Sequence, residues 1–400
     1  MNVPKLRFKE FNDGYNALKL SDVAELTSSK RIYLSDYTDN GIPFYRGKEI
    51  SELKLNKPVS DLLYISDEKY KEIEAKYGVP KENDILVTGV GTLGNIYRIP
   101  NNNKFYFKDG NLIWLKNIKQ NSEYLEYNLE FNKKKLLDSA IGSTQKALTI
   151  AGLNKLSFYY PSTSEQTKVA RTMQLIDIKI NLQSKKIEDL KLFKKGLINK
   201  VINELTFYKK IELSELGVTY TGLTGKTKED FENGESRYIP FVDILNNKIN
   251  IDILPLVNIK KNEIQNKVRK YDLFFNTSSE TANEVGLCTT LNFDIENTYL
   301  NSFCFGYRIN DVNKINNEYL NILLHSNIYR KKISILGQGF TRVNISKNKL
   351  MKIKVLIPSY KKQLEIVDVI NIENNKILLE ESKLYKLQKL KKGLMQNVFV

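Results

Sequence analysis

The chain repeats itself at a fixed separation, and this repeat constrains the fold more than any other feature of the sequence. The stretch GSTQKALTIAGLNKLSFYYPSTSEQTKVA, which begins at Gly142, aligns with GFTRVNISKNKLMKIKVLIPSYKKQLEIV, which begins at Gly339. Identical residues recur 197 positions apart in these stretches and beyond them: Pro161 and Pro358, Gln166 and Gln363, and KKGL at 194–197 and 391–394. A register that holds without insertion over this length indicates two copies of one structural unit.

The repeat extends upstream more loosely. IPF at 42–44 aligns with IPF at 239–241, and the segment DILVTGVGTLG has a counterpart in DLFFNTSSETANEVG. Each copy therefore consists of a variable segment of mixed strand character followed by a long helix. This organisation predicts an α+β chain of four parts: a first domain at 1–160, a central helix at 161–203, a second domain at 204–357 and a C-terminal helix at 358–400.

Both helical segments carry apolar residues at steps of four and three, which is a heptad pattern. Each segment spans about 38 residues, with Ser164 as the expected N-cap of the first. We expect the two helices to pair antiparallel as a coiled-coil spacer that holds two similar domains apart with pseudo-twofold symmetry; the alternative is that each helix folds back on its own domain. The predicted pairing residues are Val169, Met173, Ile176, Ile180, Ile187, Leu190, Leu197, Val201, Ile366, Ile370, Ile377, Leu384, Leu387, Leu394 and Val398.

Composition narrows the class of protein. The 400 residues are 41% hydrophobic and 27% charged, which is typical of a folded chain with more than one domain. No apolar run is long enough for a membrane span and the N-terminus has no apolar signal core, so a cytoplasmic location is expected. The residues Cys288, Cys304 and His325 are too few to predict a disulfide framework or a metal site, and we expect His325 to be an ordinary helix-surface residue.

The net charge of +16 favours a polyanionic partner. Nucleic acid is preferred over anionic lipid, because no cationic amphipathic anchor is evident. A lysine-rich proteome would produce the same charge without such a partner.

Gly89, Gly91 and Gly94 have the G-x-G-x-x-G spacing of a dinucleotide-binding turn. Such a turn must lead into a helix, whereas NIYRIP after Gly94 favours a second strand. We therefore interpret the glycines as the tip of a β-hairpin and expect no bound cofactor. A methyltransferase N-P-P-Y motif and a P-loop are absent, and DEKYKEIEAKYG, despite a nuclease-like E-x-K at Glu74 and Lys76, is typical of an exposed amphipathic helix.

Taken together, VPKLRFKEF, IPFYRGKEI, DILVTGVGTLG and the repeated block resemble the specificity subunit of type I restriction-modification enzymes. The resemblance covers nearly the whole chain and is strongest in the repeated glycine-to-proline-to-glutamine block with its following helix. The chain departs from the family at Gly89, where arginine is frequent, and in PSTSEQ and PSYKKQ, which replace a proline-rich run.

The resemblance implies that each variable segment is a target recognition domain that reads one half of a split double-stranded DNA sequence. It implies that the helices dock two modification subunits, which bind S-adenosylmethionine and methylate adenine at N6. Restriction subunits would add translocation and cleavage with ATP and Mg. The chain itself would be a non-catalytic subunit without cofactor or metal.

Side chains that contact DNA must be polar or basic and lie in loops. The candidates are Arg46, Lys48, Thr88, Thr92, Asn95, Gln145 and Lys146 in the first copy, and Asn276, Thr277, Ser278, Ser279, Thr281, Asn283, Arg342 and Asn344 in the second. Two other functions fit less well: a nuclease or methyltransferase that acts alone, and a coiled-coil adaptor that does not read DNA.

Overall fold

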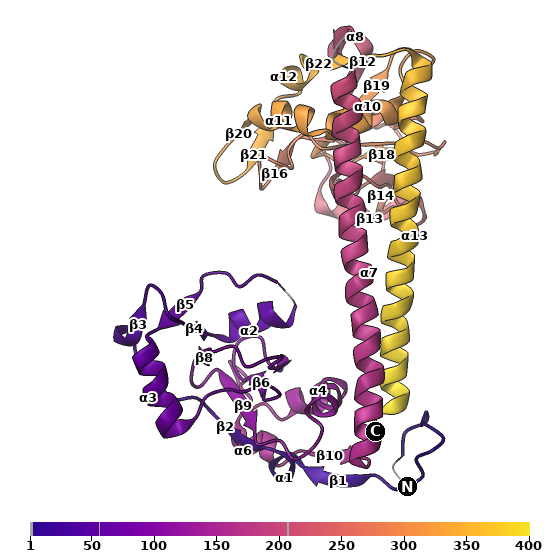
Figure 1. Cartoon of the computed structure of the whole chain (residues 1–400). Coiled ribbons are helices and arrows are strands. Elements are labelled where there is room, and N and C mark those ends of the chain that lie inside the picture. Colours follow the sequence, from indigo (N-terminus) through magenta and orange to yellow (C-terminus); the bar gives the residue numbers. More distant parts are fainter. Residues whose placement is uncertain (1–2, 56, 206–207) are drawn as a thin grey trace. The chain divides into compact units, whose positions relative to one another are not determined.

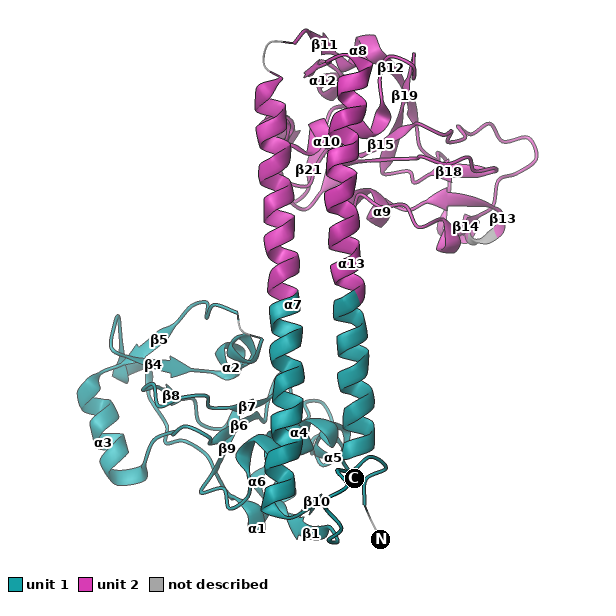
Figure 2. Ribbon diagram, turned by 45° about the vertical axis from the view of Figure 1, so that its right-hand side comes forward, with its two compact units in different colours: residues 1–183, 383–400 teal, residues 184–382 magenta. Residues whose placement is uncertain are grey.

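The structure, a computed structural model, describes residues 3–55, 57–205 and 208–400. The chain divides into two compact units: unit 1 comprises Met1–Gln183 with Lys383–Val400, and unit 2 comprises Ser184–Ser382. Figure 2 shows that each unit contains one mixed α+β domain together with part of both long helices. Each unit thus contains a domain and segments of both long helices, whereas the four parts that the sequence predicts separate the domains from the helices.

Unit 1 is built on small sheets. The larger ones are a four-stranded antiparallel sheet and a four-stranded mixed sheet, and a two-stranded ribbon joins the N-terminal segment to the chain before the first long helix. In spatial order the sheets are β2 (Glu25–Thr27), β9 (Leu112–Lys116), β6 (Ile85–Thr88) and β7 (Ile96–Arg98); β3 (Tyr37–Thr38), β5 (Leu63–Ile65), β4 (Ile42–Tyr45) and β8 (Tyr106–Phe107); and β1 (Asn16–Lys19) with β10 (Ser157–Tyr160).

Short helices cover these sheets. They are α1 (Leu20–Val23), η1 (Leu34–Asp36), α2 (Gly47–Lys54), α3 (Asp67–Tyr77), α4 (Ser122–Phe131), α5 (Lys133–Asp138) and α6 (Ile150–Asn154). The interpretation of DEKYKEIEAKYG as an amphipathic helix is confirmed by α3, which buries Tyr70 and Ile73 and leaves Glu74 and Lys76 exposed. Ser66 caps this helix by accepting a hydrogen bond from the amide of Lys69.

Unit 2 repeats the plan with different strand lengths. Its sheets, in spatial order, are β12 (Gly217–Thr221), β19 (Cys304–Ile309), β15 (Leu273–Asn276) and β17 (Cys288–Thr290); β14 (Leu256–Val257), β13 (Phe231–Ile239) and β18 (Thr298–Leu300); β16 (Ser278–Ser279), β21 (Val343–Ile345) and β20 (Gly337–Gln338); and β11 (Lys210–Glu212) with β22 (Lys354–Leu356). Its short helices are α8 (Leu213–Leu216), η2 (Lys228–Asp230), α9 (Phe241–Leu245), η3 (Ile251–Ile253), α10 (Asn317–His325), α11 (Asn327–Ile335) and α12 (Lys347–Met351).

The glycine-rich turn is the hairpin that the sequence predicts. Strand β6 pairs antiparallel with β7, and the turn between them contains Gly91 and Gly94 at φ of +77° and +69°. Unit 2 has the equivalent hairpin, β15 with β17, and its Gly286 has a φ of +66° directly before Leu287, as Gly94 precedes Asn95. Glycine adopts this left-handed backbone without the steric cost of a Cβ, which explains its place in both turns.

Helices α7 (Thr163–Glu204) and α13 (Tyr360–Val398) are the longest elements, and in each unit their segments lie side by side (Figure 1). In unit 1 Lys391 forms an ion pair with Asp177 at 2.6 Å. In unit 2 Lys186 contacts Glu380 and Lys194 contacts Asn374, both at 3.0 Å, so the residue numbers rise on one helix as they fall on the other. The predicted antiparallel arrangement is therefore present in each unit. Helix α7 begins one residue before Ser164, so the prediction of Ser164 as its N-cap is wrong.

The predicted pairing residues are all buried or half-buried. Among them, Val169 and Met173 belong to the same apolar cluster as Val398 and Leu394 on the other helix and as Tyr124 of α4. The helices therefore pack on each other and on the domain of the same unit. The buried members are Val169, Met173, Ile176, Ile187, Ile366, Ile370, Ile377 and Val398; the half-buried members are Ile180, Leu190, Leu197, Val201, Leu384, Leu387 and Leu394.

Candidate nucleic-acid interface

Three segments of unit 1 meet at Gly89, the first residue after strand β6. Its amide donates a hydrogen bond of 2.8 Å to the carbonyl oxygen of Asn111, and its own carbonyl accepts one of 2.9 Å from the amide of Leu148. The turn after β6, the chain before β9 and the hairpin around Ile141 and Ala147 are thereby fixed to one another. We call this arrangement the loop frame.

Unit 2 contains the same loop frame at equivalent positions. The amide of Thr277 donates to the carbonyl oxygen of Phe303 at 3.1 Å, and its carbonyl accepts from the amide of Ile345 at 2.9 Å. Strand β16 also pairs with β21, which brings Ser278 opposite Asn344 (Figure 1). The structure thus places the predicted run at 276–283 beside Arg342 and Asn344, which are some sixty residues away in the sequence.

One glycine shapes the projecting hairpin of each frame. Gly142 has a φ of +116° and Gly339 a φ of +125°. A Cβ on Gly142 would lie 2.3 Å from the carbonyl oxygen of Gln145, and one on Gly339 would lie 2.1 Å from that of Arg342. Both the left-handed backbone and this close approach require glycine. The turn leaves the side chains that follow the glycine exposed at the tip of the hairpin.

Seven predicted contact residues are exposed at the loop frames, one is exposed on α2, and three are half-buried. These exposed residues are available to a ligand, and they include basic groups as well as amides and hydroxyls. The exposed residues are Thr92, Gln145, Lys146, Thr281, Asn283, Arg342, Asn344 and, on α2, Lys48; the half-buried ones are Arg46, Asn95 and Thr277.

Four predicted contact residues are buried, and their assignment as direct contacts needs correction: Thr88, Asn276, Ser278 and Ser279. The Thr88 hydroxyl accepts from the amide of Asn95 at 2.9 Å and donates to the carbonyl oxygen of Thr92, so it holds the turn together. In the same way Asn276 donates to the carbonyl oxygen of Glu284 at 3.0 Å and the Ser279 hydroxyl donates to the carboxylate of Glu284 at 2.7 Å. Thr, Asn and Ser favour turns because their side chains can bond in this way to the nearby chain, although the buried hydroxyl of Ser278 makes no such bond within the described residues.

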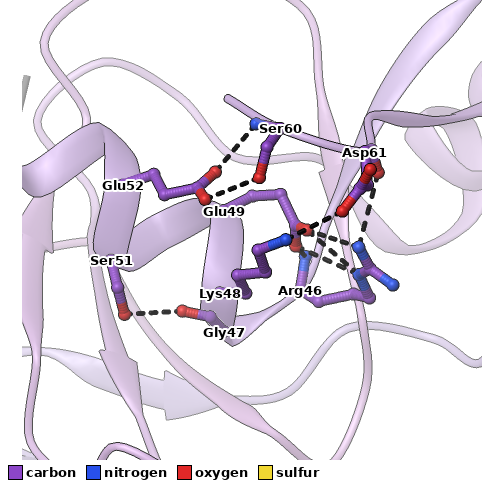
Figure 3. Close-up of polar contacts among 8 residues, drawn as sticks. All are labelled: Arg46, Gly47, Lys48, Glu49, Ser51, Glu52, Ser60 and Asp61. Carbon is purple, nitrogen blue, oxygen red and sulfur yellow. Dashed lines mark hydrogen bonds and ion pairs between the residues drawn. The ribbon is translucent and has the colours of Figure 1, made fainter. Parts of the chain in front are cut away.

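Arg46 and Lys48 are each engaged by an acidic partner at the start of α2 (Figure 3). The Arg46 guanidinium contacts the buried carboxylate of Glu49 at 2.5 Å, and Lys48 contacts the exposed Asp61 at 2.9 Å. Burial, the largest single influence, raises the pKa of the Glu49 carboxyl. Hydrogen bonds from Arg46 and from the amide of Glu49, together with the Arg46 charge, leave the pKa below its usual value. Arg46 is therefore held in place by the fold. The exposed ion pair of Lys48 with Asp61 is weak, so Lys48 can leave Asp61 and bind another anion.

Two aromatic residues at the loop frame of unit 2 are not among the contacts that the sequence predicts. Phe340 is fully exposed at the hairpin tip, and Phe303 is about half exposed. The Arg342 guanidinium carbon lies 5.7 Å from the centre of the Phe303 ring. A comparison of the two repeats could have found Phe340, because the aligned residue in the first copy is Ser143.

His325 is not the surface residue that the sequence predicts. It ends helix α10, its ring is half-buried, and its Nδ1 lies 2.8 Å from the carbonyl oxygen of Asn321. Burial lowers its pKa to about 4, with the nearby Arg330 and Lys194 acting in the same direction. The ring is therefore neutral at physiological pH and contributes to the fold.

Neither a metal cluster nor a membrane span is evident in the part of the chain that the structure describes. Residues 3–55, 57–205 and 208–400 contain no group of three or more His, Cys, Asp or Glu arranged to hold a metal ion. Across the same residues, no helix has both the length and the apolar character needed to cross a membrane.

Several proteins of similar sequence carry related descriptions. A putative type I restriction enzyme MjaX specificity subunit from Methanocaldococcus jannaschii is 22% identical and aligns with 98% of this chain and 95% of that protein. A putative type I restriction enzyme specificity subunit, S.HindORF215P, from Haemophilus influenzae is 30% identical over 168 residues, which are 41% of this chain and 40% of that protein.

Solved structures show the same fold. The S subunit of a type I restriction-modification system from M. genitalium matches 100% of this chain and 99% of its own with a TM-score of 0.57 at 16% identity. A chain from a structural study of complex assembly and conformational transition in the type I R-M system matches 97% and 98% with a TM-score of 0.63 at 14% identity.

The family comparison agrees with the duplicated structure. The family described as "Type I restriction modification DNA specificity domain" matches residues 12–192 and again residues 207–389. The two matches coincide with the two copies that the repeat and the paired loop frames define. The chain therefore belongs to the type I restriction-modification DNA specificity family and contains two copies of its domain.

Proposed function

We propose that each unit reads one half of a bipartite double-stranded DNA target and that the chain is the non-catalytic specificity subunit of a type I complex. The observation that carries this proposal is the loop frame, which is built twice by the same main-chain hydrogen bonds but presents different exposed side chains in each copy. A conserved frame with exchangeable tips can recognise two different sequences with one scaffold. The net charge of +16 supports attraction to the DNA backbone.

The long helices offer a surface for partner subunits. Although one face of each helix is buried, both helices also expose large apolar side chains. These are Leu175, Ile178, Leu182, Leu192 and Phe193 on α7 and Leu364, Val369, Ile372, Leu378, Leu379, Tyr385 and Leu390 on α13. Exposed apolar side chains gathered on one element favour a protein interface. Each unit carries some of them, which supports the docking of two modification subunits.

The chemistry would then reside in the partners. In this proposal the modification subunits bind S-adenosylmethionine and methylate adenine, and restriction subunits use ATP and Mg for translocation and cleavage. Because its proposed target is cellular DNA, we expect the complex to act in the cytoplasm.

A segment exchange tests the two-reader proposal. Residues 15–160 are replaced by the matching segment of another specificity subunit, and the complex with its partners is expressed in a host whose DNA is then sequenced for methylated bases. We expect a change in one half of the methylated sequence only. The matched exchange of residues 208–357 should change the other half, and a change of both halves by either exchange would contradict the proposal.

Two further measurements separate the alternatives. The purified chain is incubated with DNA and S-adenosylmethionine without partners, and any methyl incorporation would favour an enzyme that acts alone. DNA affinity is measured over a range of salt concentrations, because a DNA reader loses affinity steeply as salt rises. An adaptor without DNA reading would bind no DNA at any salt concentration.

A further inference from the structure

The two loop frames differ in chemistry at the positions that face solvent. The main-chain hydrogen bonds and the repeat align three exposed or half-exposed positions: Asn111 with Phe303, Ser143 with Phe340, and Gln145 with Arg342. The first copy therefore presents two amides and a hydroxyl, which are hydrogen-bonding groups. The second presents two aromatic rings and a guanidinium.

The surroundings of Phe340 reveal no role for its side chain in the stability of unit 2. Its side chain is as exposed as in an extended peptide, and it lies at the tip between β20 and β21. A ring that stays in water after folding contributes no hydrophobic free energy to the stability of the native chain. Phe303 is 54% exposed and belongs to the same frame, so both rings expose apolar surface there, and the Phe303 ring lies beside the Arg342 guanidinium. Such a surface indicates an occupant that binds aromatic rings.

The chain segment that contains this hairpin carries an excess of positive charge, which favours a polyanionic occupant, while the segment paired with it carries Glu280 and Glu284. Residues 319–364 contain ten Lys or Arg and no Asp or Glu, whereas the aligned residues 122–167 contain five of each kind. Protein–protein interfaces are usually depleted in charged residues at their core, so such a large excess of positive charge is not typical of a surface that binds another protein. A nucleic acid satisfies both features, because its phosphates attract the basic groups and its bases offer flat apolar faces.

We propose that Phe340 inserts as a wedge between base pairs of the second half-site, with Arg342 beside it on the DNA. The Arg342 guanidinium carbon lies 5.7 Å from the centre of the Phe303 ring, and this cation–π contact favours a defined approach of Arg342 to a phosphate or a base edge. Aromatic and aliphatic side chains that enter between base steps unstack them and bend the duplex. Unit 1 has Ser143 in place of Phe340, and its exposed Ile141 lies in the bridge with Ala147 rather than at the tip of the hairpin. It therefore reads its half-site by hydrogen bonds from Ser143 and Gln145.

This inference rests on the proposed function and assigns different modes of reading to the two units. Recognition by unit 2 depends in part on the free energy needed to unstack a base step, and this free energy varies with the sequence of the step. Unit 1 reads donors and acceptors on base edges. The two half-sites are therefore expected to differ in character, with a flexible step such as TA or CA confined to the half read by unit 2.

The variant F340S tests the wedge by installing the residue that the first copy has at this position. The full chain with its modification subunits is used to select binding sequences from a pool of random duplexes. 2-Aminopurine is then placed at successive positions of the selected duplex, because its fluorescence rises when a base loses its stacking partner. The modification subunits flip the adenine that they methylate, so a signal at that base is expected in both half-sites for the wild type and the variants alike. We expect the wild type to show one additional unstacked step, in one half-site only. F340S should abolish that signal and lower affinity on the order of tenfold, while F340W retains both.

I264S is the matched control, since Ile264 is equally exposed in unit 2 but lies in the loop after β14. It should leave affinity and fluorescence unchanged. The thermal unfolding of F340S should also match that of the wild type, because the ring it removes makes no buried contacts.

The outcomes distinguish the inference from the proposed function. If the wild type selects a bipartite sequence and F340S binds it with the same affinity and fluorescence, the wedge is wrong while the proposed function stands. If F340S instead loses its modification subunits with DNA binding intact, the ring is a protein contact and the inference is overturned. If the wild type selects no bipartite sequence, the proposed function fails and the wedge with it.

Discussion

The side-chain oxygen of Gln363 accepts a hydrogen bond of 2.9 Å from the main-chain amide of Asn316, the N-cap of helix α10. In unit 1 Gln166 makes the equivalent bond of 3.1 Å to Asn121, the N-cap of α4. The amide nitrogen of each glutamine also donates to the carbonyl of the proline five residues earlier, Pro358 and Pro161. The glutamine of the repeat thus connects the start of each long helix to a helix of the adjoining domain.

Replacement of either glutamine by leucine should destabilise its unit. Both side chains are fully buried, and leucine of similar size would leave the partner amide and carbonyl groups without hydrogen bonds. We expect Gln363→Leu and Gln166→Leu each to lower the free energy of unfolding by about 1–3 kcal/mol, measured by denaturant titration. Gln388→Leu, on an exposed part of α13, is the control and should change little. Equal stability of all three variants would contradict this role.

The long helices should respond differently to a charge on their buried and exposed faces. Ile377→Lys places an ammonium group at a buried position of α13 within unit 2, and we expect a loss of about 3 kcal/mol or more in the free energy of unfolding. Leu182→Lys places the same charge on an exposed position of α7 and should leave stability unchanged. If the exposed face docks modification subunits, Leu182→Lys should nevertheless weaken their co-purification. Intact folding of Ile377→Lys would argue against the helix packing.

Arg46 and Lys48 should separate stability from binding. Arg46→Ala leaves the buried Glu49 carboxylate without its guanidinium partner, and we expect about 2 kcal/mol less stability near pH 7. Lys48→Ala removes only an exposed pair with Asp61 and should alter stability by less than about 0.5 kcal/mol. If Lys48 contacts a phosphate, its loss should still weaken DNA binding and reduce the salt dependence. Equal effects of both variants on unfolding would contradict the assignment.

The free energy of unfolding should decrease as the pH is lowered, because His325 is protonated more readily in the unfolded chain than in the folded one. The pKa of His325 is lowered from 6.5 to about 4 by burial, so the folded state favours the neutral ring. This contribution is fully present above pH 6.5 and is lost as the pH falls from 6.5 towards 4, up to about 3 kcal/mol in total. Denaturant titrations across this range should show the loss for the wild type. His325→Gln cannot be protonated, so it should show a smaller loss, and identical pH profiles for the two chains would disprove the effect.

The sequence by itself determined the duplication, the two long helices and the hairpin at the glycine-rich turn. These features extend over many residues, and a periodic pattern or a repeated register holds whatever the rest of the chain does. It also indicated the loops that form the candidate interface, since residue type and loop position alone single out both Arg342 and the run at 276–283.

Only the tertiary structure decided which polar side chains in those loops face solvent. Thr88 and Asn276 have the same residue types as exposed loop neighbours, yet the segments that close over them bury their side chains. Tertiary structure also joined Thr277 to Ile345 and left Phe340 uncovered. The physical reason is that burial in a short loop depends on which distant segments pack against it, and no local pattern of the sequence encodes that packing.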